Sequence, residues 1–243
     1  MNVCFISSLF ADSYDQADKP EIFEKMDNYD YFLFTNLPKE NFKTSWEIIE
    51  IDYMFNNTDI SSNIIKSRYP KFMGWYILNE IMNKKYDIIF YCDAIRYPIK
   101  NNIWDAYSKD ILNNEFGLLH QKHQRDAYSE LQVVHSKYKK DNKLRCNKTK
   151  DFFLKKNFPR NELMTENDIF GYDPNNQIIT DTFTEFWNFY KNYLFTHRDQ
   201  PLWSFFLWKN NIKPLILNKH GLRNKLKDIQ LINKGFNNHN NYT

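Results

Sequence analysis

One apolar segment constrains the fold more than any other part of the chain. Residues 85–94 read Lys-Tyr-Asp-Ile-Ile-Phe-Tyr-Cys-Asp-Ala, so an unbroken apolar run ends abruptly at Asp93. Aromatic and β-branched residues without polar alternation predict a strand that is buried on both faces. Such strands are typical of parallel sheets flanked by helices, in which ligands bind beyond the carboxyl ends of the strands. Asp93 is therefore either a ligand-binding carboxylate or the cap of the next segment.

Strands and helices alternate through the first half of the chain. We predict further strands at residues 3–10, 29–36, 46–52, 116–120, 167–172 and 214–218. We predict helices at residues 69–81, 124–138, 181–195 and 199–209. The basic stretch 137–156 is expected to be an exposed loop leading into a short helix, and the Asn-rich tail 233–243 to be disordered. The pattern predicts one α/β domain over residues 1–232, with a mostly parallel central sheet and helices on both faces.

Composition excludes several functional classes. The chain has 243 residues and a mild net charge of +3, which does not by itself indicate a nucleic-acid-binding protein. Its five glycines argue against a Gly-rich dinucleotide fold. Three widely spaced cysteines form neither a disulfide framework nor a zinc pattern, which indicates a reducing compartment. No apolar stretch reaches the length of a membrane span. We therefore expect a cytoplasmic protein, at most peripheral at a membrane surface, and leave its oligomeric state open.

Four motifs follow one another along the chain. Arg68 and Lys71 open a predicted helix, a strand ends at Asp93, residues 123–130 read His-x-Arg-Asp-x-x-x-Glu, and residues 198–200 read Arg-Asp-Gln before a run of aromatics. In this order the motifs resemble a GT-A type glycosyltransferase. More specifically, they resemble the glycosyltransferase-like family of plant mucilage- and turgor-related, microbial and viral proteins. The resemblance spans residues 3–217, with a tyrosine at position 91 in place of the first Asp of an Asp-x-Asp motif.

The resemblance implies a hexosyl- or pentosyltransferase that uses a UDP- or GDP-sugar and a glycan or glycolipid acceptor. It implies Mn²⁺ or Mg²⁺ as cofactor, held by Asp93 and His220. The residues expected to bind the nucleotide-sugar donor are Ser7, Ser8, Arg68, Lys71, Tyr91, Asp93 and Arg198. Arg68 and Lys71 have a structural alternative, because Tyr69 and Phe72 mark the core face of their helix and leave both cations free to face solvent.

The same resemblance assigns residues to the acceptor side. Asp199 is the expected catalytic base, which favours inversion of configuration. Its alternatives are a helix N-cap, or a hydrogen-bonding role toward a sugar, because a helix N-terminus lowers the pKa of a carboxylate and weakens it as a base. The residues expected to bind the sugar or acceptor are His123, Arg125, Asp126, Glu130 and Gln200. A structural ion-pair network among them is the alternative.

Two other functions compete with sugar transfer. A plant relative in the resembled family is linked to ceramide hydrolysis, and a lipid-amide hydrolase would draw its ligands from Asp93, His120, His123 and His220. A non-catalytic module that binds glycan or nucleic acid would use the basic stretch 137–156 and nearby aromatics. Neither a catalytic triad, a zinc signature nor a nucleic-acid motif supports them in the sequence.

Overall fold

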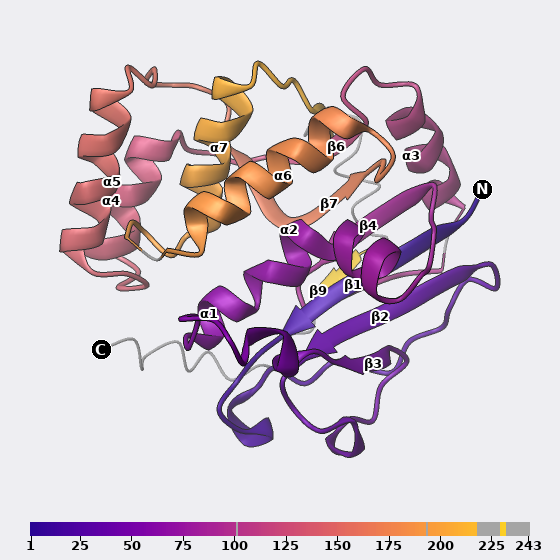
Figure 1. Cartoon of the computed structure of the whole chain (residues 1–243). Helices are drawn as coiled ribbons and strands as arrows, with labels where there is room; N and C mark the ends of the chain where they lie inside the picture. The colour runs from indigo at the N-terminus through magenta and orange to yellow at the C-terminus, as the bar shows by residue number, and fades with distance from the viewer. Residues whose placement is uncertain (101, 193, 218–228, 232–243) are drawn as a thin grey trace.

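The computed structural model describes residues 1–100, 102–192 and 194–217, and the backbone of residues 229–231. Within these ranges seven strands form one central sheet in the order β3-β2-β1-β4-β7-β6-β8 (Figure 1). The strands are β1 Val3–Leu9, β2 Tyr29–Thr35, β3 Glu47–Glu50, β4 Ile88–Cys92, β6 Leu118–Lys122, β7 Thr165–Tyr172 and β8 Leu215–Leu217. A separate short pair joins β5 Arg96–Pro98 to β9 Ile229–Leu231.

A single reversed strand lies inside an otherwise parallel sheet. β1 pairs in parallel with both β2 and β4, whereas β7 is antiparallel to both of its neighbours, β4 and β6. The chain steps outward from β1 to β2 and β3, then returns to β4 on the other side of β1. The strand order therefore reverses between β1 and β4, and the crevice beyond the carboxyl ends of such strands is the usual ligand site of an open α/β sheet.

Helices cover both faces of the sheet. The helices are α1 Asn63–Lys66, α2 Arg68–Tyr76, α3 Ile103–Leu112, α4 Ala127–Ser136, α5 Lys143–Lys155, α6 Gln177–Tyr190 and α7 Asp199–Lys209. Shorter helical turns are η1 Tyr14–Gln16, η2 Lys39–Asn41, η3 Asp52–Phe55 and the π-helical η4 Ile77–Ile81. α3 packs on one face of the sheet, and α2, α4, α6 and α7 form the larger core on the other. The predicted α/β domain with a mostly parallel sheet is confirmed.

Strand alternation determines which side chains reach which face. In β1 Phe5 belongs to the core under α3, while Ile6 belongs to the core under α2 and α6. In β4 Phe90 lies on the α3 side and Tyr91 on the opposite side. Because side chains alternate along a strand, Ser8 and Asp93 belong to the same face as Tyr91.

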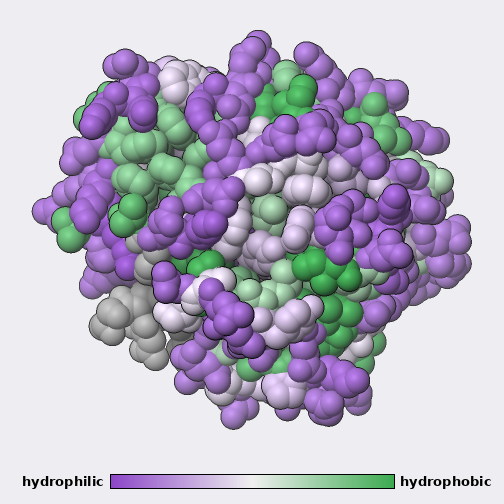
Figure 2. All heavy atoms as spheres, in the orientation of Figure 1, coloured by the Kyte–Doolittle hydropathy of each residue, from purple (hydrophilic) through white to green (hydrophobic). Residues whose placement is uncertain are grey.

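The structure corrects the predicted elements in three places. Most of the basic stretch 137–156 is the thirteen-residue helix α5, because Cys146, Thr149 and Phe153 bury one side of it. The helix predicted to begin at residue 181 begins four residues earlier, after Asn176 caps it. Helix α3 was not predicted. No helix in the described part of the chain combines the length and the apolar character needed to cross a bilayer, and Figure 2 shows that hydrophilic side chains dominate the visible surface.

Gly171 makes the close packing of β7 testable. A Cβ atom at this position would lie 2.5 Å from ring atoms of Phe90 and 2.8 Å from Ile111. We expect Gly171→Ala to lower the free energy of unfolding by about 1–3 kcal/mol, the usual effect of overpacking a close-packed core. Urea denaturation measures the change, and Ile22→Ala at an exposed position is the control. A Gly171→Ala protein as stable as the wild type would contradict this packing.

Candidate functional site

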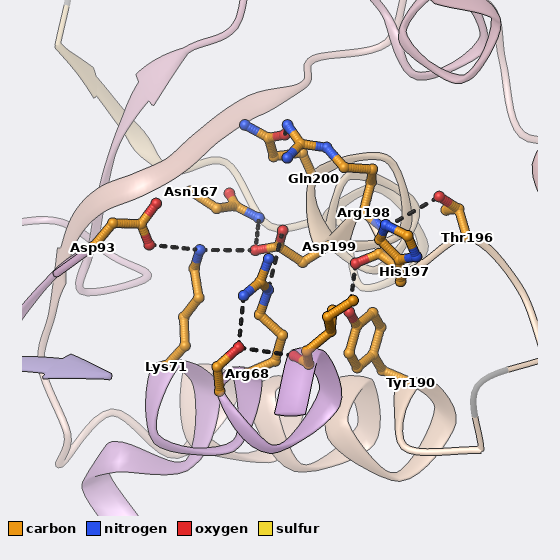
Figure 3. Close-up of polar contacts among 12 residues, drawn as sticks. Arg68, Lys71, Asp93, Asn167, Tyr190, Thr196, His197, Arg198, Asp199 and Gln200 are labelled. Atoms are coloured by element: carbon orange, nitrogen blue, oxygen red, sulfur yellow. Dashed lines mark hydrogen bonds and ion pairs between the residues drawn. The ribbon is translucent and has the colours of Figure 1, made fainter. Parts of the chain in front are cut away.

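A buried lysine joins two carboxylates at the carboxyl edge of the sheet. Lys71 Nζ lies 3.4 Å from Asp93 Oδ1 and 3.0 Å from Asp199 Oδ2 (Figure 3). The Lys71 side chain is 3% exposed and that of Asp199 is 4% exposed. A charge this deeply buried is stable only with partners of opposite sign. The contact ties together α2, the end of β4 and the beginning of α7.

Arg68 joins the same cluster from one turn earlier in α2. Its Nε lies 3.7 Å from Asp199 Oδ1, and its NH1 donates to Ser67 Oγ at 2.8 Å. Residues three apart share a helix face, so the two cations point the same way. Both cations point toward Asp93 and Asp199 at the edge of the sheet (Figure 3). The structural alternative, in which they face solvent, is therefore wrong.

Tyr91 and Ser8 orient the Asp93 carboxylate. The Tyr91 hydroxyl donates to Asp93 Oδ1 at 2.8 Å and lies 3.2 Å from Ser8 Oγ, which donates to the carbonyl oxygen of Ser67 at 2.7 Å. Burial and the adjacent Asp93 charge hold the pKa of Tyr91 well above its usual value, so the phenol stays protonated as a donor. The tyrosine at the first position of the expected Asp-x-Asp motif therefore positions the second carboxylate.

Asp199 is held as an anion. Burial alone would raise the pKa of Asp199, but Lys71, Arg68 and Arg198 outweigh it and hold that pKa well below its usual value. Asn167 donates to Asp199 Oδ2 at 3.3 Å. Asp199 is the first residue of α7 and Arg198 is its N-cap, so the predicted N-cap position is wrong by one residue. These contacts give Asp199 an ion-pairing role toward Lys71 and Arg68, which neither the N-cap nor the sugar-binding alternative had predicted.

A second cluster of charges lies beyond the end of β6. Arg125 NH1 lies 2.8 Å from Glu130 Oε2, and His123 Nε2 lies 3.8 Å from the same oxygen. Arg198 NH2 lies 3.8 Å from Glu130 Oε1 and donates to the side-chain oxygen of Gln200. The structure thus brings together four of the five residues predicted for the sugar or acceptor, with Glu130 buried at their centre.

Glu166, at the start of β7, contacts two residues of the second cluster, one of which, Gln200, directly follows Asp199 in the chain. Gln200 Nε2 donates to Glu166 Oε2 at 2.9 Å, and His123 Nε2 lies 3.5 Å from Oε1. Burial, followed by the neighbouring Asp168 charge, raises the pKa of Glu166 to about 7. The side chain remains 31% exposed. A carboxylate with this pKa and partial solvent access is suited to exchange protons near neutral pH.

Asp168 and Arg96 form the third charged pair at this edge. Arg96 NH2 lies 2.7 Å from Asp168 Oδ2, and Asp93 N donates to the backbone oxygen of Asp168 at 2.8 Å. Burial raises the pKa of Asp168. Its other oxygen, Oδ1, is buried and has no hydrogen-bond partner in the described part of the chain. Glu166, Asn167 and Asp168 are therefore three consecutive polar residues at the beginning of the antiparallel strand β7.

A buried aspartate fixes the segment that leads into α7. Asp141 Oδ2 accepts from Thr196 Oγ1 at 2.7 Å and from His197 N at 2.9 Å. The Tyr190 hydroxyl donates to the carbonyl oxygen of His197 at 2.6 Å. These contacts set the backbone immediately before Arg198, so the Arg-Asp-Gln segment enters the site in a defined orientation (Figure 3).

Three predicted site residues lie outside these clusters. Ser7 is fully buried and alternates to the opposite face of the sheet from Ser8. Asp126 caps α4 by accepting from Ser129 N at 2.9 Å, a structural role that differs from the ion-pair network given as its alternative. His220 lies outside the described residues, as does the predicted tail 233–243.

The sequence hypotheses missed Glu166, Asn167, Asp168 and Arg96. A local signal for the first three was present, because the polar triplet Glu-Asn-Asp directly precedes the apolar end of a predicted strand. The triplet indicates a site only if β7 is antiparallel to its neighbours, because only then does the start of β7 lie beside the carboxyl ends of β4 and β6. Nothing in the local sequence indicates that reversal.

His120 is excluded from the ligand pool of the hydrolase alternative by its contacts. Its ring is fully buried and stacks on Phe170, Nε2 accepts from Trp203 Nε1 at 3.2 Å, and Nδ1 lies 3.2 Å from the Glu166 carbonyl oxygen. Burial lowers the pKa of His120 to about 3, so the ring stays neutral. Both ring nitrogens are occupied within the core.

Comparisons with known proteins give similarity at the level of solved structures alone. No protein-family model matches the sequence. No curated protein sequence matches it either. Among solved structures, the chain is similar to mouse xyloside xylosyltransferase 1 in its apo form, at a TM-score of 0.48 and 7% sequence identity. The match covers 96% of this chain and 94% of that one.

The Lys71–Asp199 contact is testable through stability. We expect Asp199→Asn to lower the free energy of unfolding by about 3 kcal/mol or more at pH 7, because it leaves two buried cations short of a partner. Since the folded-state pKa of Asp199 is depressed, its contribution is present above the unfolded pKa of about 3.9 and is lost as pH falls toward the folded value. The difference in free energy of unfolding between Asp199→Asn and the wild type should therefore become smaller below about pH 4.

Urea denaturation at pH 7 and pH 3 measures the gap between the two proteins. Asp126→Asn is the matched control, because Asn caps a helix about as well as Asp. A pH-independent gap, or none at pH 7, would show that the Asp199 charge does not stabilise the fold.

Proposed function

We propose that this protein is a glycosyltransferase that transfers a sugar from a nucleoside diphosphate sugar to a hydroxyl group of a glycan or glycolipid. The observation that carries the proposal is the position of the Lys71, Asp93 and Asp199 cluster. It lies beyond β1 and β4, where the strand order reverses and open α/β sheets bind ligands. Sugar transfer requires a site that neutralises a leaving diphosphate and positions an acceptor hydroxyl.

The donor would occupy the Arg68 and Asp93 side of the site. The Arg68 side chain is 22% exposed and that of Arg198 is 23% exposed, so each is partly accessible to a ligand although its Nε is buried. A guanidinium matches a phosphate with two parallel hydrogen bonds. Lys71 is too deeply buried for a direct role of this kind and would act by holding Asp93 and Asp199 in place.

The donor set near Asp93 fits a divalent cation that is held largely by the donor phosphates. Within the described ranges no group of three or more His, Cys, Asp or Glu residues forms a metal-binding cluster. Mg²⁺ sites commonly use one or two carboxylates plus substrate phosphates. The Asp93 side chain is 36% exposed. Tyr91 and Lys71 both contact Oδ1 of Asp93, and neither of these two contacts involves Oδ2. When bound, Mn²⁺ or Mg²⁺ would supply charge neutralisation of the diphosphate.

Glu166 is the carboxylate best suited to accept a proton from the acceptor. Its pKa of about 7 matches the requirement for a general base, whereas Asp199 has a strongly depressed pKa and is nearly inaccessible. Gln200 and His123 fix the orientation of the Glu166 carboxylate. A base at this position supports inversion of configuration. The earlier assignment of the base to Asp199 remains a competing hypothesis.

A thermal-shift panel of UDP, GDP and their sugars, each with and without Mn²⁺, tests the donor site. We expect one nucleotide to raise the melting temperature, because a ligand that binds only the folded state stabilises it by mass action. Asp93→Asn should remove the Mn²⁺-dependent part of the shift, and Asp110→Asn on the exposed surface of α3 should leave it intact. The donor proposal fails if no nucleotide produces a shift.

The pH dependence of turnover tests the base. For the wild type, kcat/KM should rise with pH to a plateau above about 7, as Glu166 loses its proton. Glu166→Gln should bind the donor normally, lose about 100-fold or more in kcat, and lose the rise near pH 7. Glu162→Gln, in the loop before β7, is the control. Retention of the pH profile in Glu166→Gln, with its loss in Asp199→Asn, would assign the base to Asp199.

A further inference from the structure

We propose that Arg125, Lys137 and Lys140, gathered around the Tyr138 ring, form an anion-binding subsite for a phosphate group carried by the acceptor. The binding of phosphate is independent of the donor. Its assignment to the acceptor rests on the proposed glycosyltransferase function.

Three cations surround one exposed aromatic ring. The Tyr138 centroid lies 5.7 Å from Arg125 Cζ, 5.8 Å from Lys137 Nζ and 5.8 Å from Lys140 Nζ. Arg125 NH2 also donates to the Tyr138 hydroxyl at 3.1 Å. The ring quadrupole attracts each cation, so the tyrosine gathers charges that would otherwise repel one another.

The cluster has more positive than negative charge. Arg125 pairs with Glu130, whereas neither Lys137 nor Lys140 forms an ion pair with an acidic side chain in the part of the chain that the structure describes. Residues 137–156 contain nine Lys and Arg residues and only two Asp residues, although the net charge of the whole chain is +3. Asp141, one of the two, is buried against Thr196 and His197. The excess charge around Tyr138 is therefore available to an external anion.

The position of the cluster connects it to the acceptor side of the site. Arg125 and Arg198 both contact Glu130. Asp141, the residue after Lys140, contacts Thr196 and His197 immediately before the Arg-Asp-Gln segment, so Lys140 lies near this segment. Burial and then the Arg198 charge lower the pKa of Lys140. An acceptor whose hydroxyl reached Glu166 could therefore place a nearby charged group against Arg125 and Lys140.

The number and type of cations favour phosphate over a single carboxylate. A phosphate offers several strong acceptor oxygens and more than one negative charge, and guanidinium groups bind it with two hydrogen bonds. Lys148 and Lys155 are exposed lysines on the outer face of α5, and among the residues that the structure describes neither lies over an aromatic ring, so they provide a comparison within the same basic stretch.

Binding of methyl phosphate, measured by isothermal titration calorimetry without nucleotide, tests the subsite. We expect the double variant Lys137→Gln, Lys140→Gln to bind about tenfold or more weakly, because it removes two of the three cations that would contact the phosphate. The control Lys148→Gln, Lys155→Gln removes the same charge and should bind within about twofold of the wild type, because its lysines lie outside the cluster. Both double variants should keep the wild-type melting temperature.

Flotation with vesicles identifies the source of the phosphate. The vesicles are phosphatidylcholine alone or phosphatidylcholine with phosphatidic acid. Recruitment by phosphatidic acid that fails only in Lys137→Gln, Lys140→Gln supports a lipid-borne phosphate, and methyl phosphate binding without recruitment supports a soluble acceptor. Equal losses in both double variants, or no binding of either probe by the wild type, would overturn the subsite. If no nucleotide raises the melting temperature in the thermal-shift panel, the glycosyltransferase proposal is overturned. The anion-binding subsite is not affected by that result.

Discussion

The structure of the site depends on the Lys71 ammonium lying between the carboxylates of Asp93 and Asp199. This buried charge requires both partners, and each partner comes from a different part of the chain. The contact therefore fixes the beginning of α2 and the beginning of α7 against the end of β4. Breaking a buried pair on one side leaves an uncompensated charge, so the three elements are energetically coupled.

The sheet topology turns this local contact into a two-sided site. The parallel strands β1, β4 and β6 end at the same edge where the reversed strand β7 begins. Asp93 and Arg68 lie toward the reversal of strand order, and the Arg125, Glu130 and Arg198 cluster lies beyond β6. Glu166 lies with the second cluster, in contact with His123 and with Gln200, which directly follows Asp199 of the first cluster in the chain. A donor on one side and an acceptor on the other would meet at that carboxylate.

The sequence was sufficient to predict the strands and helices that are determined by the hydrophobic pattern. The run before Asp93 is strand β4, and the Arg-Asp-Gln segment does introduce helix α7. Pattern alone could not show that Lys71 faces inward, because a lysine beside an aromatic core face is ordinarily solvated and only the two distant carboxylates explain its burial. Nor could it identify Glu166, whose raised pKa depends on burial and on the reversed direction of β7.

The most direct measurement is an experimental structure of the protein with a nucleoside diphosphate and Mn²⁺ bound. We expect the diphosphate beyond the ends of β1 and β4, in contact with the Arg68 guanidinium and next to the Asp93 carboxylate. A nucleotide bound at another surface, with the Lys71, Asp93 and Asp199 cluster free of ligand, would contradict the proposed site and with it the glycosyltransferase function.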